Sequence, residues 1–154
     1  MALLALHGSR IAAALALGLA FGGIALAASP DEQQHMRETA MKKAGGDLKA
    51  LSADAKAGAV SAGAAAKAKE LIDFGAGLEA LFPEGPQSEK SRALPAIWTD
   101  KAGFSAKAKD LQTAAAAVSA AVTAGDAKAL AAAIDQTGAA CGACHKAFRG
   151  PEKD

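Results

Sequence analysis

The two cysteines of the chain stand three residues apart and are followed at once by a histidine. The stretch reads Cys141-Gly142-Ala143-Cys144-His145. Two thiols at this spacing can add across the two vinyl groups of a haem, and the histidine that follows can bind its iron. On a helix, Cys141 and His145 share one face and Cys144 lies one step away along it. The motif therefore predicts one covalent haem c, attached through Cys141 and Cys144 and ligated by His145.

Three other chemistries use a pair of cysteines, and each fits the stretch less well. A structural disulfide, in a purely structural helical protein, suits an exported chain, but cysteines three apart inside a helix are poorly placed for one. A thioredoxin-like redox pair opens a helix after a strand, a setting that this sequence lacks. A zinc site needs four ligands, for which the chain after residue 27 offers only Cys141, Cys144, His145 and His35.

Four stretches carry the apolar spacing of amphipathic helices, and none has convincing strand alternation. They cover about 31–52, 61–82, 100–124 and 126–149. Their apolar stripes are Met41, Ala44, Leu48 and Leu51; Leu71, Phe74, Leu78 and Leu81; Phe104, Ala108, Leu111, Ala115, Val118 and Val122; and Leu130, Ile134, Thr137, Cys141, Cys144 and Phe148. We expect an all-α fold, an antiparallel four-helix bundle with the Cys-x-x-Cys-His motif on its last helix.

Residues at the predicted helix ends agree with these stretches. Asp100 and Asp126 can each accept a hydrogen bond from the first turn of the helix that follows. Gly125 can end the third helix in a left-handed turn. The third and fourth helices are therefore expected to be joined by a very short connection.

The segment between the second and third helices, 83–99, contains three prolines and is too long for a tight helical hairpin. We expect a crossover or an ordered flap, in which Leu94, Ile97 and Trp98 fold back onto the core. Much of the apolar content elsewhere is alanine, which buries little area, whereas each fully buried Leu, Ile or Phe contributes about 1.5–3 kcal/mol. The haem is therefore expected to supply much of the core between the first and last helices. Without it, the protein should have a cavity flanked by Met41, Cys141, Cys144 and His145.

Residues 1–27 have the pattern of a cleaved secretory signal peptide. One cation, Arg10, precedes an apolar run that ends in Ala25-Leu26-Ala27, with small residues at both positions that flank a cleavage site. The alternative is an anchor helix, but the run is interrupted by glycines and is at the short limit for spanning a bilayer. Cleavage would leave one domain, 28–154, in the periplasm with no stable membrane anchor.

The charge of this domain does not indicate a polyanionic partner. Without Arg10 the chain carries 16 basic and 16 acidic residues and has no basic run. This balance favours neither nucleic acid nor an anionic membrane surface as a partner. No grouping of residues for substrate activation is evident either, so we expect a protein that is not an enzyme.

The chain resembles the cytochrome c-prime family, the class II cytochromes c. The residues that carry the resemblance are 37–43, 81–85, 97–100 and 141–149. The resemblance implies that the haem lies between the first and last helices, with its distal face against the first. It also implies that Arg37 lies near a haem propionate and Arg149 near the proximal imidazole; the alternative for both arginines is a solvated helix face. It further implies either a monomer or a homodimer paired through its first helix.

Met41 stands where the gas-binding members of that family place a bulky apolar residue, four positions after Arg37. A methionine there is similar to the low-spin branch of cytochrome c-556 type, in which a thioether and an imidazole both bind iron. The resemblance thus implies one-electron transfer with redox partner proteins through a six-coordinate His145/Met41 iron. The runner-up is a five-coordinate protein that binds or senses NO or CO, in which Met41 only fills space. Met36 and His35 point away from Met41 on a helix and are poor rival ligands.

Overall fold

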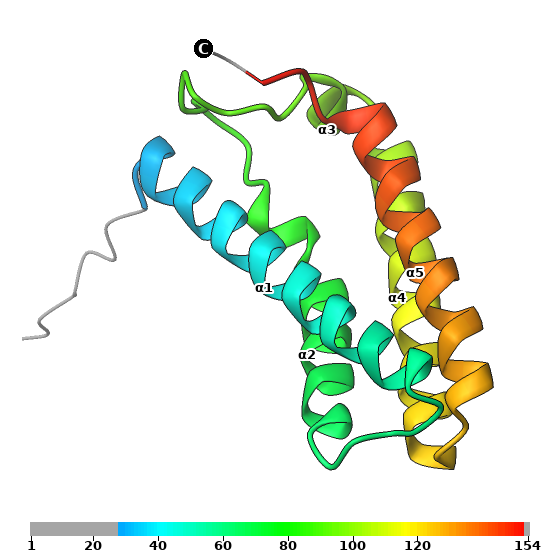
Figure 1. Cartoon of the computed structure of the whole chain (residues 1–154). Coiled ribbons are helices and arrows are strands. Elements are labelled where there is room, and N and C mark those ends of the chain that lie inside the picture. The colour runs from blue at the N-terminus through cyan, green and yellow to red at the C-terminus, as the bar shows by residue number, and fades with distance from the viewer. Residues whose placement is uncertain (1–27, 153–154) are drawn as a thin grey trace, which may run out of the picture.

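The fold, seen in a computed structural model that describes residues 28–152, consists of four long helices and two short ones; the predicted signal peptide lies outside the described residues. The elements are α1 (Pro30–Lys56), α2 (Ala64–Gly77), the 3-10 turn η1 (Glu79–Leu81), α3 (Ala96–Thr99), α4 (Lys101–Ala124) and α5 (Ala127–Phe148). Helix α1 packs against α2 and α5, and α4 packs against α2 and α5. Successive long helices run in opposite directions (Figure 1). The predicted antiparallel four-helix bundle is confirmed.

Local hydrogen bonds explain where the helices begin and end. Ser29 and Glu32 form a reciprocal capping box at the start of α1. The backbone N–H of Glu32 donates to the Ser29 hydroxyl, with an N···O distance of 3.3 Å, and the backbone N–H of Ser29 donates to the Glu32 carboxylate at 2.7 Å. Asp100 and Asp126 each accept from the backbone N–H three residues later, at 3.0 and 2.9 Å. Gly125 ends α4 with a φ of 66°, in the left-handed region. The three end signals predicted from the sequence are confirmed.

The second helix is shorter than its apolar stripe predicts. Helix α2 ends at Gly77, and the chain continues through η1 to Phe82, whose φ and ψ are −123° and 60°. Pro83 follows, and a residue that precedes proline is disfavoured in the helical region. The last turn of the predicted helix is therefore replaced by a 3-10 turn, while α1 continues about one turn beyond its predicted end at residue 52.

The apolar core has a closed end, where α1 meets α2 and α4 meets α5 (Figure 1). Its buried cluster consists of Leu51, Ala64, Ala68, Leu71, Ala115, Val118, Ala121, Val122, Leu130, Ala133 and Ile134. Nearly half of these residues are alanine, which lets the helices approach closely but removes little apolar area from water. The closed end therefore holds the helices together with few large side chains.

The opposite end of the bundle is crossed by the segment between α2 and α4. Ile97 on α3 is buried with Phe104 and Phe148, and the Phe104 ring makes edge-to-face contacts with Phe82 at 5.1 Å and with Phe148 at 5.3 Å. Trp98 packs against this cluster and donates its indole N–H to the carbonyl of Phe82 at 3.2 Å. The predicted return to the core is confirmed for Ile97 and Trp98, whereas Leu94 is half-buried and lies against Gly150. None of the helices between residues 28 and 152 has the length and apolar character needed to cross a membrane.

Candidate functional site

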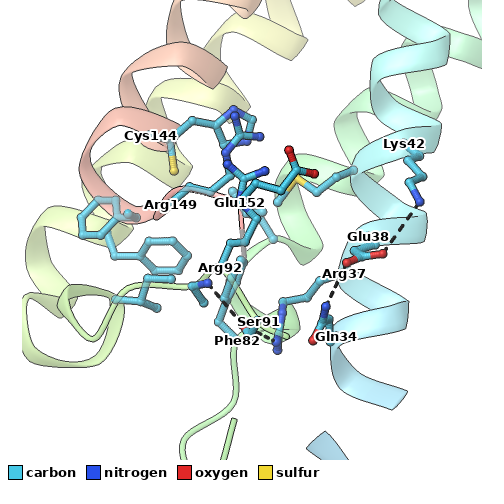
Figure 2. Close-up of a pocket in the computed structure, with 17 residues that line it drawn as sticks. Gln34, Arg37, Glu38, Lys42, Phe82, Ser91, Arg92, Cys144, Arg149 and Glu152 are labelled. Atoms are coloured by element: carbon cyan, nitrogen blue, oxygen red, sulfur yellow. Dashed lines mark hydrogen bonds and ion pairs between the residues drawn. The ribbon is translucent and has the colours of Figure 1, made fainter. Parts of the chain in front are cut away.

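A cavity of about 510 Å³ lies between the N-terminal half of α1 and the C-terminal end of α5. Cofactor and ligand sites commonly measure about 300–1,000 Å³. Figure 2 shows the side chains of Gln34, Arg37, Glu38 and Lys42 on α1 on one side of it and Cys144 on α5 on the other. The apolar part of the lining comes from Met41, Leu78, Phe82, Ala93, Ile97, Phe104 and Phe148. The cavity therefore has an apolar interior and a charged rim.

The cysteine motif lies within the unbroken helix α5, near its C-terminal end. Cys144 and His145 line the cavity. Cys141 does not, although we expected a cavity flanked by both cysteines: its side chain packs against the cluster of Leu78, Ala108 and Leu111, one turn deeper in the bundle. Cys144 and His145 thus face the cavity. The Cys141 thiol packs against an adjoining apolar cluster, which shares Leu78 with the cavity wall.

The state of the two thiols argues against the alternative cysteine chemistries. Cys141 and Cys144 are half-buried and are not joined by a disulfide. Burial raises the pKa of both thiols; for Cys144 the neighbouring Cys141 raises the pKa further and Lys107 lowers it in part. Reactive redox cysteines have a lowered pKa and commonly occupy helix N-termini. Within the part of the chain that the structure describes, no three His, Cys, Asp or Glu side chains are grouped to hold a metal ion, which disfavours zinc.

The imidazole of His145 is half-buried at the cavity wall. Burial lowers the pKa of His145, and the positive charges of Arg149 and Arg92 lower it further. Each of these effects favours the neutral imidazole, which is the form that binds a metal. His145 is therefore held in the protonation state that an axial ligand requires.

Met41 reaches the same cavity from the facing helix. Its side chain is half-buried on α1, lines the cavity, and packs against the cluster that also contacts Cys141. Met36, one turn earlier, is 50% exposed, and His35 is exposed as well. The prediction that these two residues point away from Met41 is confirmed. The thioether of Met41, a soft ligand, and the imidazole of His145, a borderline ligand, thus line one cavity from two different helices.

Arg37 is a buried cation at the cavity wall, only 5% exposed. It donates to the carbonyl of Leu81 at 3.2 Å and to the hydroxyl of Ser91 at 3.3 Å, and its guanidinium lies 5.3 Å from the centre of the Phe82 ring. Burial lowers the pKa of Arg37, while Glu38 raises it. The alternative of a solvated helix face is therefore wrong for Arg37.

Arg149 lies at the mouth of the cavity rather than inside it. It is exposed, caps α5 in an extended conformation, and donates its backbone N–H to the carbonyl of His145 at 3.0 Å. Its side chain nevertheless lines the cavity, and its charge acts on the His145 imidazole. Arg149 thus combines the two predicted alternatives, because it is solvated and also electrostatically coupled to the site.

Ser91 and Arg92 are site residues that sequence reasoning did not find. Ser91 is buried and accepts from Arg37, and Arg92 lines the cavity. Both lie in the proline-containing segment between α2 and α4, where apolar periodicity gives no indication of which side chains face inward. The only available signal was the presence of Ile97 and Trp98 shortly after them, which predicted that this segment returns to the core.

The residues at this cavity fit a covalently bound haem. The Cys144 thiol and the His145 imidazole line its apolar interior, and the Cys141 thiol packs against the adjoining apolar cluster. Arg37 uses two of its five N–H groups in hydrogen bonds, and within residues 28–152 the ion pairs are all formed by lysines, so the cavity arginines remain available to carboxylates such as haem propionates. The amide oxygen of Gln34 is buried at the cavity without a hydrogen bond, as expected where a bound group completes the site.

Comparison with known proteins gives one consistent result. Residues 32–149 match the protein family described as cytochrome C′. The chain is 36% identical to a cytochrome c′ of Pararhodospirillum photometricum over 124 residues, which cover 79% of this chain and 99% of that protein. It is 37% identical to a cytochrome c-556 of Agrobacterium fabrum over 142 residues, 90% of this chain and 93% of that protein. The nitric oxide complex of a cytochrome c prime variant from Alcaligenes xylosoxidans has a similar structure, with a TM-score of 0.71 and 32% identity over 80% of this chain and 98% of that one.

Proposed function

The chain belongs to the cytochrome c′ family, and we propose that it transfers single electrons through a haem iron bound by His145 and Met41. Proteins of this family are non-enzymatic haem proteins with one covalent haem c, and the chain accordingly carries one such group. When bound, the haem accepts and releases one electron at its iron, at a potential that its axial ligands help to set. The predicted signal peptide supports a periplasmic location, where redox proteins would be its partners.

The observation that carries this proposal is that Met41 and His145 line one cavity from opposite helices. In the proposed arrangement Cys141 and Cys144 hold the cofactor on α5, and His145 contributes a neutral imidazole. Met41 would contribute a thioether from α1 as the second ligand, and small molecules would then find no open position on the iron. Histidine with methionine is a ligand pair of electron-transferring cytochromes, and methionine raises the potential.

The apolar residues of the cavity support the same role. Leu78, Ile97 and Phe104 are buried and line the cavity, so this part of the wall would shield the cofactor from bulk water. Such surroundings favour the less charged, reduced state over the oxidised state. The similarity to a cytochrome c-556, over nearly the full length of both chains, is consistent with this proposal.

A second candidate function is the binding of nitric oxide or carbon monoxide by a five-coordinate haem. It is favoured by the structural similarity to a cytochrome c prime whose structure was determined as a nitric oxide complex. In that case Met41 would remain a packing residue against Leu78 and the neighbouring apolar cluster. The two functions thus differ in whether Met41 binds the iron or leaves that position open to a gas.

Replacement of Met41 by leucine tests the proposal. Leucine has a similar volume, and such exchanges usually cost less than about 1.5 kcal/mol, so the fold should persist while the thioether is lost. We expect Met41→Leu to convert a low-spin absorption spectrum to a high-spin one and to let the ferrous protein bind carbon monoxide. The matched control is Met36→Leu, because Met36 is exposed and does not line the cavity; it should leave the spectrum unchanged. If Met41→Leu and the unmodified protein have the same spectrum, Met41 is not a ligand.

A further inference from the structure

The segment around Arg92 is tied directly to the end of α5. The backbone N–H of Leu94 donates to the carbonyl of Phe148 at 3.0 Å, and the N–H of Gly150 donates to the carbonyl of Arg92 at 2.7 Å. The Arg92 side chain adds a third bond, from its Nε–H to the Gly150 carbonyl at 3.0 Å. The two backbone bonds form a short antiparallel β-bridge between Ala93 and Arg149. The position of Arg92 relative to the Cys-x-x-Cys-His helix is therefore fixed by backbone as well as side-chain bonds.

The charge of Arg92 acts on the site beside it. Arg92 lines the same cavity as His145, and the bridge between Ala93 and Arg149 holds it beside the end of α5 that carries the imidazole. No carboxylate among residues 28–152 forms an ion pair with Arg92, since the ion pairs of that region all involve lysines. A fixed cation at this place disfavours any further positive charge on the imidazole side of the cavity.

We propose that Arg92 is a positioning residue of the haem site whose fixed positive charge stabilises the reduced state of the cofactor. The oxidised iron carries one more positive charge than the reduced iron, so a cation held nearby raises the reduction potential. The bond to Gly150 keeps the guanidinium from swinging into solvent, which would weaken this effect. The inference concerns the side of the cavity that His145 occupies and does not depend on whether Met41 binds iron.

Two variants separate the charge of Arg92 from its bond to Gly150. In Arg92→Gln the amide nitrogen takes the position of Nε, so the donor to Gly150 is retained and the charge is lost. In Arg92→Lys the charge is retained and that donor is lost. The matched control is Lys128→Gln, an equal loss of charge at an exposed residue in the first turn of α5, at the opposite end of that helix from His145.

The midpoint potential of the purified holoprotein is measured by spectroelectrochemical titration. We expect Arg92→Gln to shift the reduction equilibrium about three- to tenfold toward the oxidised state, where tenfold equals about 59 mV for one electron. Arg92→Lys should stay near the unmodified potential, and Lys128→Gln should not change it. A potential for Arg92→Gln that equals that of Lys128→Gln would overturn the proposal.

The same experiment distinguishes an effect of anchoring from an effect of charge. A fall in potential for Arg92→Lys but not for Arg92→Gln would assign the effect to the Gly150 bond and contradict the charge role. If Arg92→Gln fails to retain haem while Arg92→Lys retains it, the positive charge is still required at the haem site. If both variants lose haem, Arg92 has only a structural role and the proposal is wrong.

Discussion

Replacing Cys141 and Cys144 together by alanine is expected to abolish the retention of haem by the denatured polypeptide. Cys141 and Cys144 are the only cysteines of the chain; Cys144 lines the cavity, and Cys141 packs against the adjoining apolar cluster. Thioether bonds survive unfolding, whereas contacts with His145 and the cavity wall do not. Extraction of the unfolded, unmodified protein with acidic organic solvent should leave all haem on the polypeptide, and extraction of the double variant should leave none.

A control within the same helix is available at Gly138. It is exposed, and a Cβ at this position would meet no atom within 4 Å, so Gly138→Ala alters α5 one turn before Cys141 without changing the packing. Alanine is also the better helix former, by about 1 kcal/mol. This variant should retain haem fully after denaturation. Release of haem from the unmodified chain would contradict covalent attachment.

The haem-free polypeptide is expected to unfold at markedly lower denaturant concentration than the holoprotein. Its closed end is rich in alanine, and the largest fully buried side chains of the described chain are Leu51, Leu130, Val118 and Thr137. A cofactor that fills a cavity of about 510 Å³ adds apolar contacts to α1, α5 and the segment between α2 and α4. A gain of about 3 kcal/mol, equal to one or two buried large side chains, would raise the midpoint by about 1 M guanidinium chloride.

The two ends of the bundle should respond differently to loss of the haem. Hydrogen exchange should remain slow around Leu51 and Leu130, which lie in the closed core. It should become fast in the N-terminal half of α1 and around Ser91, because both parts line the cavity and are joined there by the hydrogen bond from Arg37 to Ser91. Circular dichroism gives the unfolding midpoints, and hydrogen exchange with mass spectrometry locates the loss of protection. Equal midpoints and uniform exchange in both forms would show that the haem is not part of the core.

The parts of this structure that follow from local sequence were predictable. Long apolar stripes at helical spacing fix which face of each helix is buried, and residues such as Phe104, Val118 and Leu130 lie inward as expected. Aspartate and glycine at positions 100, 125 and 126 end and begin helices by bonds to neighbouring residues, so these ends could also be assigned from the sequence.

The parts that depend on tertiary contacts were not predictable. The stripe around Leu81 continues the helical spacing, but Pro83 and the packing of Phe82 on Phe104 replace the last turn of α2. Ser91 and Arg92 become site residues only because a segment without periodicity is bonded to Arg37 and Gly150. The resemblance implied a haem site shared by Met41 and His145, and both line one cavity, but the sequence did not show that Cys141 would lie outside its lining.

The central claim, that Met41 and His145 together bind the iron, is tested most directly by the absorption spectrum of the unmodified holoprotein. The spectrum is recorded in the oxidised and reduced forms and again after carbon monoxide is added to the reduced protein. If both ligands are in place, both forms have sharp low-spin spectra and carbon monoxide changes neither the band positions nor their intensities. A broad high-spin spectrum with ready binding of carbon monoxide would contradict the claim, and it would identify Met41 as a packing residue beside an open gas-binding position.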